Sequence, residues 1–217
     1  MKATAKLSGS FLLIVLLVII FGFKALMNPN PGQLTTNDMR RMGRSIEAFN
    51  LTKFFAEEGH PWAQFQLAMH YASGDGVSQY DKLAVHWLSL ASMNYKNNRW
   101  SEGEQFSLGP DGHHAENHWA LVSQHFLAES YRFGRAHGRD LVSAYLYEKN
   151  VLQALAAVEA SALTVFRQNF LGGTTKSNVK SQVEERFNSL RDEMSAEDIS
   201  RAEELSADWR PTIIGVE

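Results

Sequence analysis

The feature that most constrains the fold is an internal repeat with a period of 60 residues. Eight positions of the first copy are matched in the second, six of them by the same residue. The pairs are Gln64 and Gln124, Leu67 and Leu127, Ala68 and Ala128, Tyr71 and Tyr131, Gly74 and Gly134, Tyr80 and Asp140, Ala84 and Ala144, and Trp87 and Tyr147. In each copy the apolar positions follow helical spacing on both sides of the glycine, which predicts two helices joined by a turn. The repeat therefore predicts two stacked helical hairpins.

The rest of the chain after residue 37 also has helical periodicity, and no segment alternates like a strand, so the predicted class is all-α. A first helix is predicted from a cap at Asn37 or Asp38 to about Glu58, with Met42, Ile46, Phe49 and Phe54 as its apolar stripe. Helical spacing continues from Val151 to Phe166, and further helices are predicted over 177–210. The last of them begins with a capping box, Ser195 with Asp198, and ends before Pro211.

The chain begins with an apolar segment of membrane-spanning character. Residues 7–23 are uncharged and lie between Lys6 and Lys24. As a helix they would span about 26 Å, close to the lower limit for a bilayer core. A cleaved signal peptide is the alternative, but no A-x-A-type cleavage site follows. The segment 1–27 is therefore predicted to be an uncleaved transmembrane anchor, with the membrane contacted through residues 7–27.

The anchor and the repeat define a predicted domain organisation. Residues 28–37, which are rich in Pro and Asn, are predicted to be a linker, and residues 38–217 the helical domain. Within it the repeats cover about 56–92 and 120–155, separated by an insertion at 94–117. A short basic N-terminus usually stays in the cytoplasm, which favours a single-pass protein of the inner membrane with its helical domain in the periplasm.

Composition excludes several functions. The 21 basic residues are outnumbered by 24 acidic ones, so the chain lacks the basic excess that nucleic-acid binding needs. It contains no cysteine, which excludes disulfides, thiolate metal sites and cysteine nucleophiles. No nucleophile elbow or phosphate-binding glycine loop occurs, so we predict neither an enzyme nor a cofactor or small-molecule substrate.

The first copy resembles the Sel1-like repeat, a helical hairpin related to the tetratricopeptide repeat. Thirteen positions match its pattern in register: Ala56, Gly59, Ala63, Gln64, Leu67, Tyr71, Gly74, Gly76, Val77, Gln79, Ala84, Trp87 and Ala91. This copy differs from the Sel1-like pattern at Ala68, Tyr80 and Leu83. The second copy matches through Leu127, Tyr131, Gly134 and Ala144, but has Glu116 and Trp119 at the opening positions and no Gly-Val after Gly134.

The resemblance implies a short α-solenoid of helical hairpins with flanking capping helices. It also implies a scaffold or adaptor that binds a protein partner in a membrane complex. Because two hairpins are fewer than a stable array usually needs, the flanking helices are expected to act as caps. An accessory subunit whose transmembrane helix packs inside a larger complex is a second form of the same interpretation.

Candidate partner-binding residues lie on the first helix of each hairpin. The side chains predicted to be exposed on this inner surface are Gln66, His70, Gln124 and Arg132. Three tryptophans near helix ends and loops, Trp62, Trp100 and Trp119, are further candidates, because aromatic residues contribute strongly to interfaces. Burial in the core is the favoured interpretation for each of them, and an interface contact is the alternative.

The insertion contains a polar cluster that offers a different function. Asp111, His113, His114, Glu116 and His118 lie close together, and His125 follows. On a helix His114 and His118 share one face, as two zinc ligands would, and Asp111 or His125 would complete the site. The glutamate that zinc proteases carry directly after their first histidine is absent. A zinc-binding protein or metalloenzyme centred on His113–His125 is therefore the alternative to the scaffold.

Overall fold

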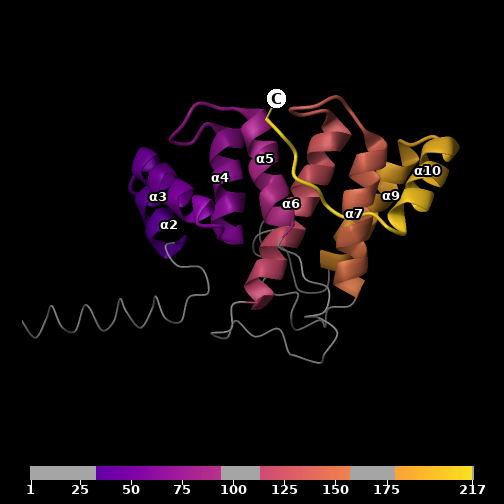
Figure 1. Ribbon diagram of the computed structural model, residues 1–217, viewed down its shortest axis with the longest axis horizontal. Helices are drawn as coiled ribbons and strands as arrows, with labels where there is room; N and C mark the ends of the chain where they lie inside the picture. The colour runs from indigo at the N-terminus through magenta and orange to yellow at the C-terminus, as the bar shows by residue number, and fades with distance from the viewer. Residues whose placement is uncertain (1–32, 94–112, 157–178, 217) are drawn as a thin grey trace, which may run out of the picture.

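The computed structural model describes residues 33–93, 113–156 and 179–216, and the regular structure of these residues is entirely helical, which confirms the all-α class. The helices are α2 (Gln33–Arg41), α3 (Ser45–Glu57), α4 (Pro61–Ser73), α5 (Asp81–Ser92), α6 (His113–Phe133), α7 (Leu141–Ala156), α9 (Val179–Asp192) and α10 (Ala196–Ser206). They stand side by side in a row that begins with α2 and α3 and finishes with α9 and α10 (Figure 1). None of these helices is long and apolar enough to cross a membrane, and residues 7–27 lie outside the described part of the chain.

The two predicted hairpins are present, and their turns have the same geometry. Helices α4 and α5 are joined by residues 74–80, and α6 and α7 by residues 134–140. Gly74 and Gly134 both take the left-handed conformation, with φ of 72° and 67°. In each turn the residue before the second helix donates its N–H to a tyrosine carbonyl of the first, Tyr80 to Tyr71 at 2.9 Å and Asp140 to Tyr131 at 3.0 Å.

A side chain of the first helix closes each turn at the same position. His70 Nδ1 lies 2.6 Å from the carbonyl oxygen of Asp75, and because a carbonyl can only accept, the imidazole donates. Ser130, the equivalent residue, donates its hydroxyl to the carbonyl of Arg135 at 2.9 Å. Two different side chains thus stabilise the same turn conformation. Because a histidine and a serine are not similar residues, the sequence comparison did not indicate this equivalence.

The turn also needs a second residue with positive φ. In the first hairpin this residue is Gly76, with φ of 78°. A Cβ built on Gly76 would lie 2.3 Å from the carbonyl oxygen of Ser45, because the turn packs directly on the start of α3. In the second hairpin the equivalent residue is Ala136, with φ of 64°. The backbone conformation is therefore repeated even where the glycine is not.

A glutamine connects each hairpin to the helix before it. Gln64 donates its Nε2 to the carbonyl of Ala56 near the end of α3, at 3.4 Å. Gln124 donates to the carbonyl of Ser92 at the end of α5, at 3.1 Å, and accepts a hydrogen bond from Asn150 of α7 at 2.6 Å. The carbonyl of Ala56 also accepts the backbone N–H of Gly59 at 3.0 Å. Both glutamine bonds thus add a contact at the end of a helix, where carbonyls lack partners within the helix. They also define the register of one helix on the next.

The main core lies between these stacked helices. Leu67, Leu121, Leu127 and Leu155 are fully buried in it, with aromatic side chains of α3 and α4 packed around them. A smaller core joins α7 to α9 and α10 through Tyr145, Leu190 and Ala202. Each fully buried leucine contributes about 1.5–3 kcal/mol relative to exposure. The stack thus has a continuous interior from α3 to α10.

The first helical segment differs from the prediction. The single helix expected from residue 38 to 58 is divided into α2 and α3, because Gly43 between them has φ of 73°. Helix α2 already begins at Gln33, within the predicted linker, so Asn37 and Asp38 are not caps. The predicted start of this helix and its predicted continuity through residue 43 were therefore wrong.

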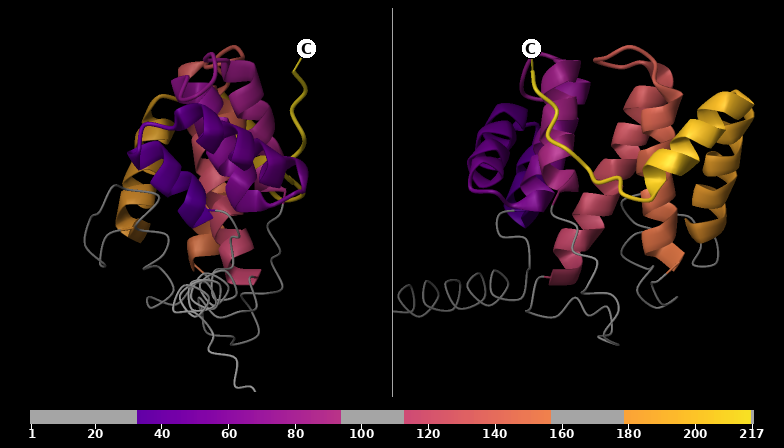
Figure 2. Two further views of the ribbon diagram at one scale, coloured as in Figure 1. Left: turned by 90° about the vertical axis from the view of Figure 1, so that its left-hand side faces the viewer. Right: turned by 45° about the vertical axis from the view of Figure 1, so that its right-hand side comes forward.

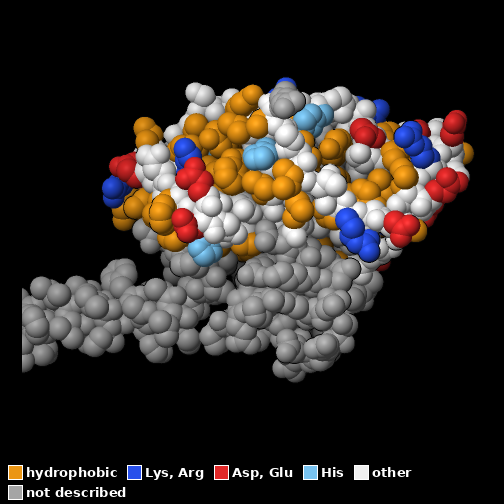
Figure 3. Space-filling view, in the orientation of Figure 1, with side chains coloured by type: hydrophobic (Ala, Val, Ile, Leu, Met, Phe, Trp, Pro, Cys, Tyr) orange, Lys and Arg blue, Asp and Glu red, His pale blue; other side chains and the backbone are white. Residues whose placement is uncertain are grey.

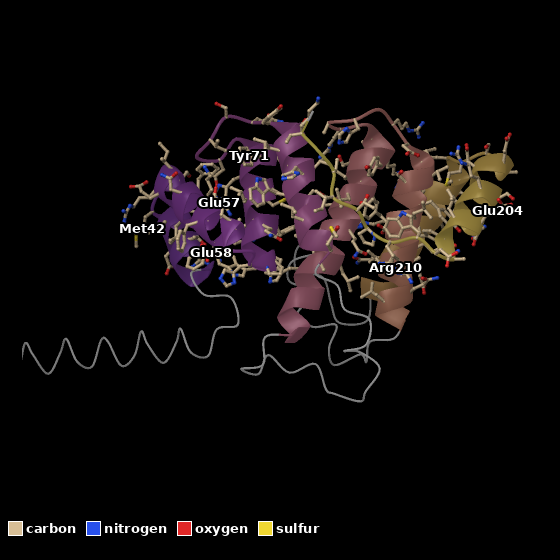
Figure 4. The ribbon with its side chains drawn as sticks, viewed as in Figure 1. Met42, Glu57, Glu58, Tyr71, Glu204 and Arg210 are labelled. Atoms are coloured by element: carbon tan, nitrogen blue, oxygen red, sulfur yellow. The ribbon has the colours of Figure 1, made fainter. Side chains whose placement is uncertain are left out.

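The predicted apolar stripe of this segment was wrong except at Phe49, which is partly buried and packs on the main core. Met42, Ile46 and Phe54 are 72%, 64% and 56% exposed, and Figure 4 shows Met42 pointing outward at the end of the row. Helix α3 buries small residues instead, at i, i+4 and i+8: Ala48, Thr52 and Ala56. Small side chains on this face allow α3 to approach α4 closely, which a bulky stripe would prevent.

The C-terminal helices follow the predicted pattern, with an earlier end. The predicted N-cap is confirmed, since Ser195 Oγ accepts the backbone N–H of Asp198 at 3.0 Å, and its hydroxyl donates to Asp198 Oδ2 at 2.8 Å. Helix α10 ends at Ser206 rather than near Pro211. Residues 209–216 leave it as an extended tail that crosses back over the stack (Figures 1 and 2).

Candidate interaction surfaces

The extended tail is the most informative surface feature. It runs from the end of α10 across α7 and reaches α5, on one side of the row of helices (Figure 2). Trp209 packs its ring edge-on against Tyr147 of α7, with ring centroids 4.7 Å apart. The Tyr147 hydroxyl is hydrogen-bonded to the backbone of Thr212, and burial raises the pKa of this hydroxyl above its usual range. Further along, Ile214 packs on the main core.

Both backbone groups of Ile214 are bound by side chains of α5. Ile214 donates its N–H to Ser89 Oγ at 2.9 Å, and its carbonyl accepts from His86 Nδ1 at 2.7 Å. Ser89 in turn donates its hydroxyl to the carbonyl of His86 at 2.7 Å. The helix therefore recognises an extended peptide by its backbone, as a neighbouring strand would, with side chains in place of strand groups. We call His86, Ser89 and Tyr147 the tail site.

Polarity is distributed unevenly on this side of the molecule. The space-filling view shows hydrophobic side chains gathered over the middle of the row, around α4 and α5, with a histidine among them (Figure 3). Charged side chains gather toward the ends of the row. An apolar centre with a few hydrogen-bonding groups is typical of surfaces that bind protein segments.

A cavity of about 220 Å³ lies between the two hairpins, away from the tail site. Its walls come from α4, α5 and α6, and include Met69, Ala72, Val85, Leu88 and Phe126. Its border carries three charged residues, Asp81, Glu129 and Arg135. On α5 the cavity uses positions 81, 84, 85 and 88, whereas the tail is bound by positions 86 and 89. We call this cavity the inter-hairpin groove; it is large enough for one or two side chains of a partner.

Four predicted partner-binding residues belong to the interior. His70 and Gln124 are 2% and 0% exposed, so the prediction that they lie on an exposed surface was wrong. Trp62 and Trp119 are 1% and 3% exposed, which confirms the core position favoured for them. His70 closes the turn of the first hairpin, and Gln124 connects the second hairpin to the end of α5. Trp62 packs against Phe55, and Trp119 against Phe65, with ring centroids 5.7 and 5.2 Å apart. Large aromatic residues near helix ends are here used to fill the space between successive helices.

The other predicted contacts have different outcomes. Gln66 is half-buried on α4, and Trp100 lies outside the described residues. Arg132 forms an ion pair with Glu193, directly after the end of α9, and donates to Ser189 of α9 at 2.8 Å. Arg139 pairs with the same carboxylate, and the hydrogen bonds from Arg132 and Arg139 lower the pKa of Glu193. The guanidinium of Arg132 thus holds α9 against the second hairpin instead of facing a partner.

A buried polar network lies between α6, α7 and α9. His125 and Glu148 are each 3% exposed, and His125 Nδ1 is 2.9 Å from Glu148 Oε2. On the other side of the ring, Arg186 lies 2.8 Å from His125 Nε2. A guanidinium can only donate, so Nε2 accepts and the imidazole is the neutral form with its proton on Nδ1, directed at Glu148. Arg186 is also 3.8 Å from Glu129.

This network bears on the zinc alternative. Both ring nitrogens of His125 are occupied, one of them by a cation, so His125 is not free to bind a metal ion. His114 and His118 belong to α6, but their side chains lie outside the described part, as does Asp111. Among the described side chains, no group of three or more His, Asp or Glu is placed to hold a metal.

A second acidic side chain links α10 to α7. Glu203 accepts hydrogen bonds from Lys149 and Tyr145, and Lys149 also donates to Ser206 at 2.9 Å. The hydrogen bonds from Lys149 and Tyr145 lower the pKa of Glu203. Burial, together with the Glu203 carboxylate, raises the pKa of Tyr145 to about 12. These contacts close the end of the stack and are structural in character.

Comparison with known proteins gives no assignment. No protein-family model matches the chain, and no curated protein matches it. The functional interpretation therefore depends on the molecule itself.

Sequence reasoning missed the tail site. The prediction placed Trp209 on the apolar face of the last helix with Ile199, Ala202 and Leu205, but this helix ends at Ser206. Ile214 follows Pro211 without a helical period, and a period is what indicates a buried segment. The signal that was available is composition: a tryptophan and two adjacent isoleucines in a non-helical segment indicate apolar surface that has to be covered.

Proposed function

We propose that this chain is a membrane-anchored scaffold that binds a segment of a partner protein and so assembles or stabilises a membrane complex. In this proposal the described helices form a short solenoid of Sel1-like hairpins, capped by α2–α3 and α9–α10. Residues 7–27 form the membrane anchor, and the helical domain lies on the periplasmic side. The chain acts without a catalytic centre or cofactor.

The observation that carries the proposal is the inter-hairpin groove. Two hairpins of the same geometry stack with a cavity of about 220 Å³ between them. Its walls are apolar and its border carries charges of both signs, which provides burial for a partner side chain and polar contacts around it. Such a surface selects a protein segment by shape and polarity, and requires no reacting group.

Support for a structural function comes also from the polar residues of the interior. The imidazole of His125, the carboxylate of Glu148 and the guanidinium of Arg186 are directed at one another. A catalytic imidazole needs a ring nitrogen within reach of a substrate proton. In His125 that nitrogen is occupied by Arg186, which favours a function in joining α9 to the hairpins.

The first test is purification of the tagged full-length protein from membranes of its source in mild detergent, followed by mass spectrometry. The proposal expects a stoichiometric partner that is lost, by at least tenfold, in an Ala72→Trp variant whose indole fills the groove. A Ser73→Trp variant places the same ring on the next, exposed position of α4 and is the matched control. A partner retained by both variants, or a monomer that carries stoichiometric zinc, would contradict the proposal.

The anchor is tested separately. Removal of residues 1–32 should move the protein from the membrane fraction to the soluble fraction, with its circular dichroism unchanged in shape. Replacement of residues 11–21 by another apolar sequence distinguishes a tether, which tolerates the change, from a subunit whose transmembrane helix packs on its partners. A truncated protein that stays in the membrane would show that residues 7–27 are not the anchor.

A further inference from the structure

The tail site is a peptide-binding site that is already occupied by a peptide of the same chain. The bound segment contacts side chains of α5 and α7 and pairs with no strand among the described residues. Three of its residues are bound in different ways: Trp209 through its ring, Thr212 through its backbone, and Ile214 through its backbone and its apolar side chain. The site is therefore selective for an aromatic residue that is followed five positions later by an aliphatic one.

The backbone contacts do not depend on the identity of the bound residues. Ser89 and His86 satisfy the N–H and the carbonyl of one residue, and any extended peptide offers the same pair of groups. Only the ring contact with Tyr147 and the apolar contact of residue 214 select side chains. Pro211, between the two anchors, favours an extended backbone and lowers the entropy lost on binding.

The tail is attached to the stack in a way that allows its exchange. Helix α10 ends at Ser206, and a short turn at 207–208 separates it from the extended segment. Within the tail, Ile213 is 55% and Val216 is 37% exposed, so the segment is held at its anchor points and not enclosed. Release of the tail would uncover Tyr147, His86 and Ser89 without unfolding a helix.

From these contacts we propose that the tail site binds an extended segment of a partner protein in place of the tail. The partner segment has an aromatic residue, preferably tryptophan, five positions before a β-branched or similar aliphatic residue. Its own N–H and carbonyl at the second position replace those of Ile214. The tail then acts as an internal competitor that reduces the affinity for the partner. This inference concerns a surface other than the inter-hairpin groove, so either proposal can fail alone.

The experiment uses the full-length protein in detergent and a fluorescent peptide with the sequence SADWRPTIIGVE, which is residues 206–217. A Trp209→Ala, Ile214→Asp double variant weakens the attached tail and leaves the tail site intact. Fluorescence anisotropy should show that this variant binds the peptide at least tenfold more tightly than the wild-type protein does. A peptide with alanine in place of its tryptophan should lose at least tenfold in affinity.

A further variant tests the site itself. Addition of His86→Ala and Ser89→Ala to the double variant should abolish peptide binding. A double variant that keeps its helical circular dichroism but binds the peptide no better than the wild type would overturn the proposal.

If the double variant does not fold, a protein whose tail is cut after folding provides a second test. A protease site placed between Ala207 and Asp208 of the otherwise wild-type chain allows the tail to be cut after folding. The proposal expects the labelled peptide to replace the cut tail, and a cut tail that does not exchange would overturn it. Sedimentation of the wild-type protein is the remaining arm: a dimer that dissociates when the peptide is added would show exchange of tails between two copies, and would overturn the partner proposal.

Discussion

At the scale of single residues, the two turns show which positions are fixed by backbone geometry. Gly76 and Ala136 are equivalent and both have positive φ, and a Cβ on Gly76 would meet the backbone of Ser45. The glycine is thus required for close approach in the first hairpin. In the second hairpin an alanine is accepted with some conformational strain.

This difference gives a prediction. A Gly76→Ala variant should lose more than about 3 kcal/mol of unfolding free energy, since its Cβ meets backbone that cannot move aside. Gly43 also has positive φ, but a Cβ there meets nothing within 4 Å, so Gly43→Ala should cost only about 1–2 kcal/mol. Ala136→Gly should be neutral or stabilising by up to about 1 kcal/mol. Urea unfolding followed by circular dichroism measures all three, and equal effects at Gly43 and Gly76 would contradict the assignment of Gly76 to close packing.

His70 provides a prediction of pH dependence. Burial lowers the pKa of His70, so the unfolded chain binds a proton more readily than the folded protein does. Its contribution to stability is therefore complete above the ordinary histidine pKa of about 6.5 and is lost as the pH falls below that value toward the folded pKa.

The matched variant is already present in the second hairpin. His70→Ser places at this position the hydroxyl that Ser130 uses for the equivalent bond. It should lower stability at neutral pH, because a smaller side chain leaves space in the core, but it should flatten the dependence of stability on pH below 6.5. An unchanged pH dependence in urea titrations would show that another group is responsible.

At the scale of helices, the structure separates stacking contacts from end contacts. Helices α3 to α7 are joined by buried leucines and by the glutamine bonds, whereas α9 is joined to the second hairpin by a smaller core and by the ion pairs of Glu193, which follows the end of α9. Partly exposed ion pairs contribute little each, so α9 is expected to open more readily than the hairpins.

Glu193→Gln tests this expectation. The variant removes the charge shared by Arg132 and Arg139, and amide exchange in α9 should become about threefold faster, as for an ion pair worth roughly 0.7 kcal/mol. Exchange in α4 and α5 should not change. Glu185→Gln, at an exposed position of α9, is the control for loss of charge. The low pKa of Glu193 means that the wild type should approach the variant as the pH falls below about 4.5.

The helices and side-chain contacts that the sequence predicts are those in which a residue acts within its own helix. Apolar spacing and the glycines at 74 and 134 predicted the hairpins, and the capping box predicted the start of α10. The use of Gln124, His70 and Arg132 was not predictable, because their partners lie on other helices or depend on a turn already formed. The same polar residue types occur on exposed faces, so type and spacing alone do not distinguish the two cases.

For the molecule as a whole, the tail connects distant parts of the chain. His86 and Ile214 are separated by 128 residues, and their hydrogen bond joins the first hairpin to the segment that follows the last helix. Stacked repeats otherwise contact only their neighbours, which allows parts of a stack to unfold independently. The tail is therefore expected to increase the cooperativity of unfolding.

Trp209→Ala should show this effect. Loss of the indole that contacts Tyr147 should lower the unfolding free energy by about 2 kcal/mol, less than for a fully buried tryptophan because Trp209 is half-buried. Amide exchange should become faster in α5 as well as in α7, since both are held by the tail. Arg210→Ala, at an exposed neighbour, should change neither. Faster exchange confined to the tail would contradict a role in cooperativity.

The paired glutamine bonds have a consequence for how such a molecule can lengthen. Each hairpin carries its own connector to the helix before it, in Gln64 and Gln124, and its own means of closing its turn, in His70 and Ser130. A duplicate of residues 61–92 inserted between α5 and α6 would bring both features with it and present a terminal carbonyl to Gln124 as Ser92 does now. Growth by gene duplication would therefore require no new interaction chemistry, only a longer tail to reach its site.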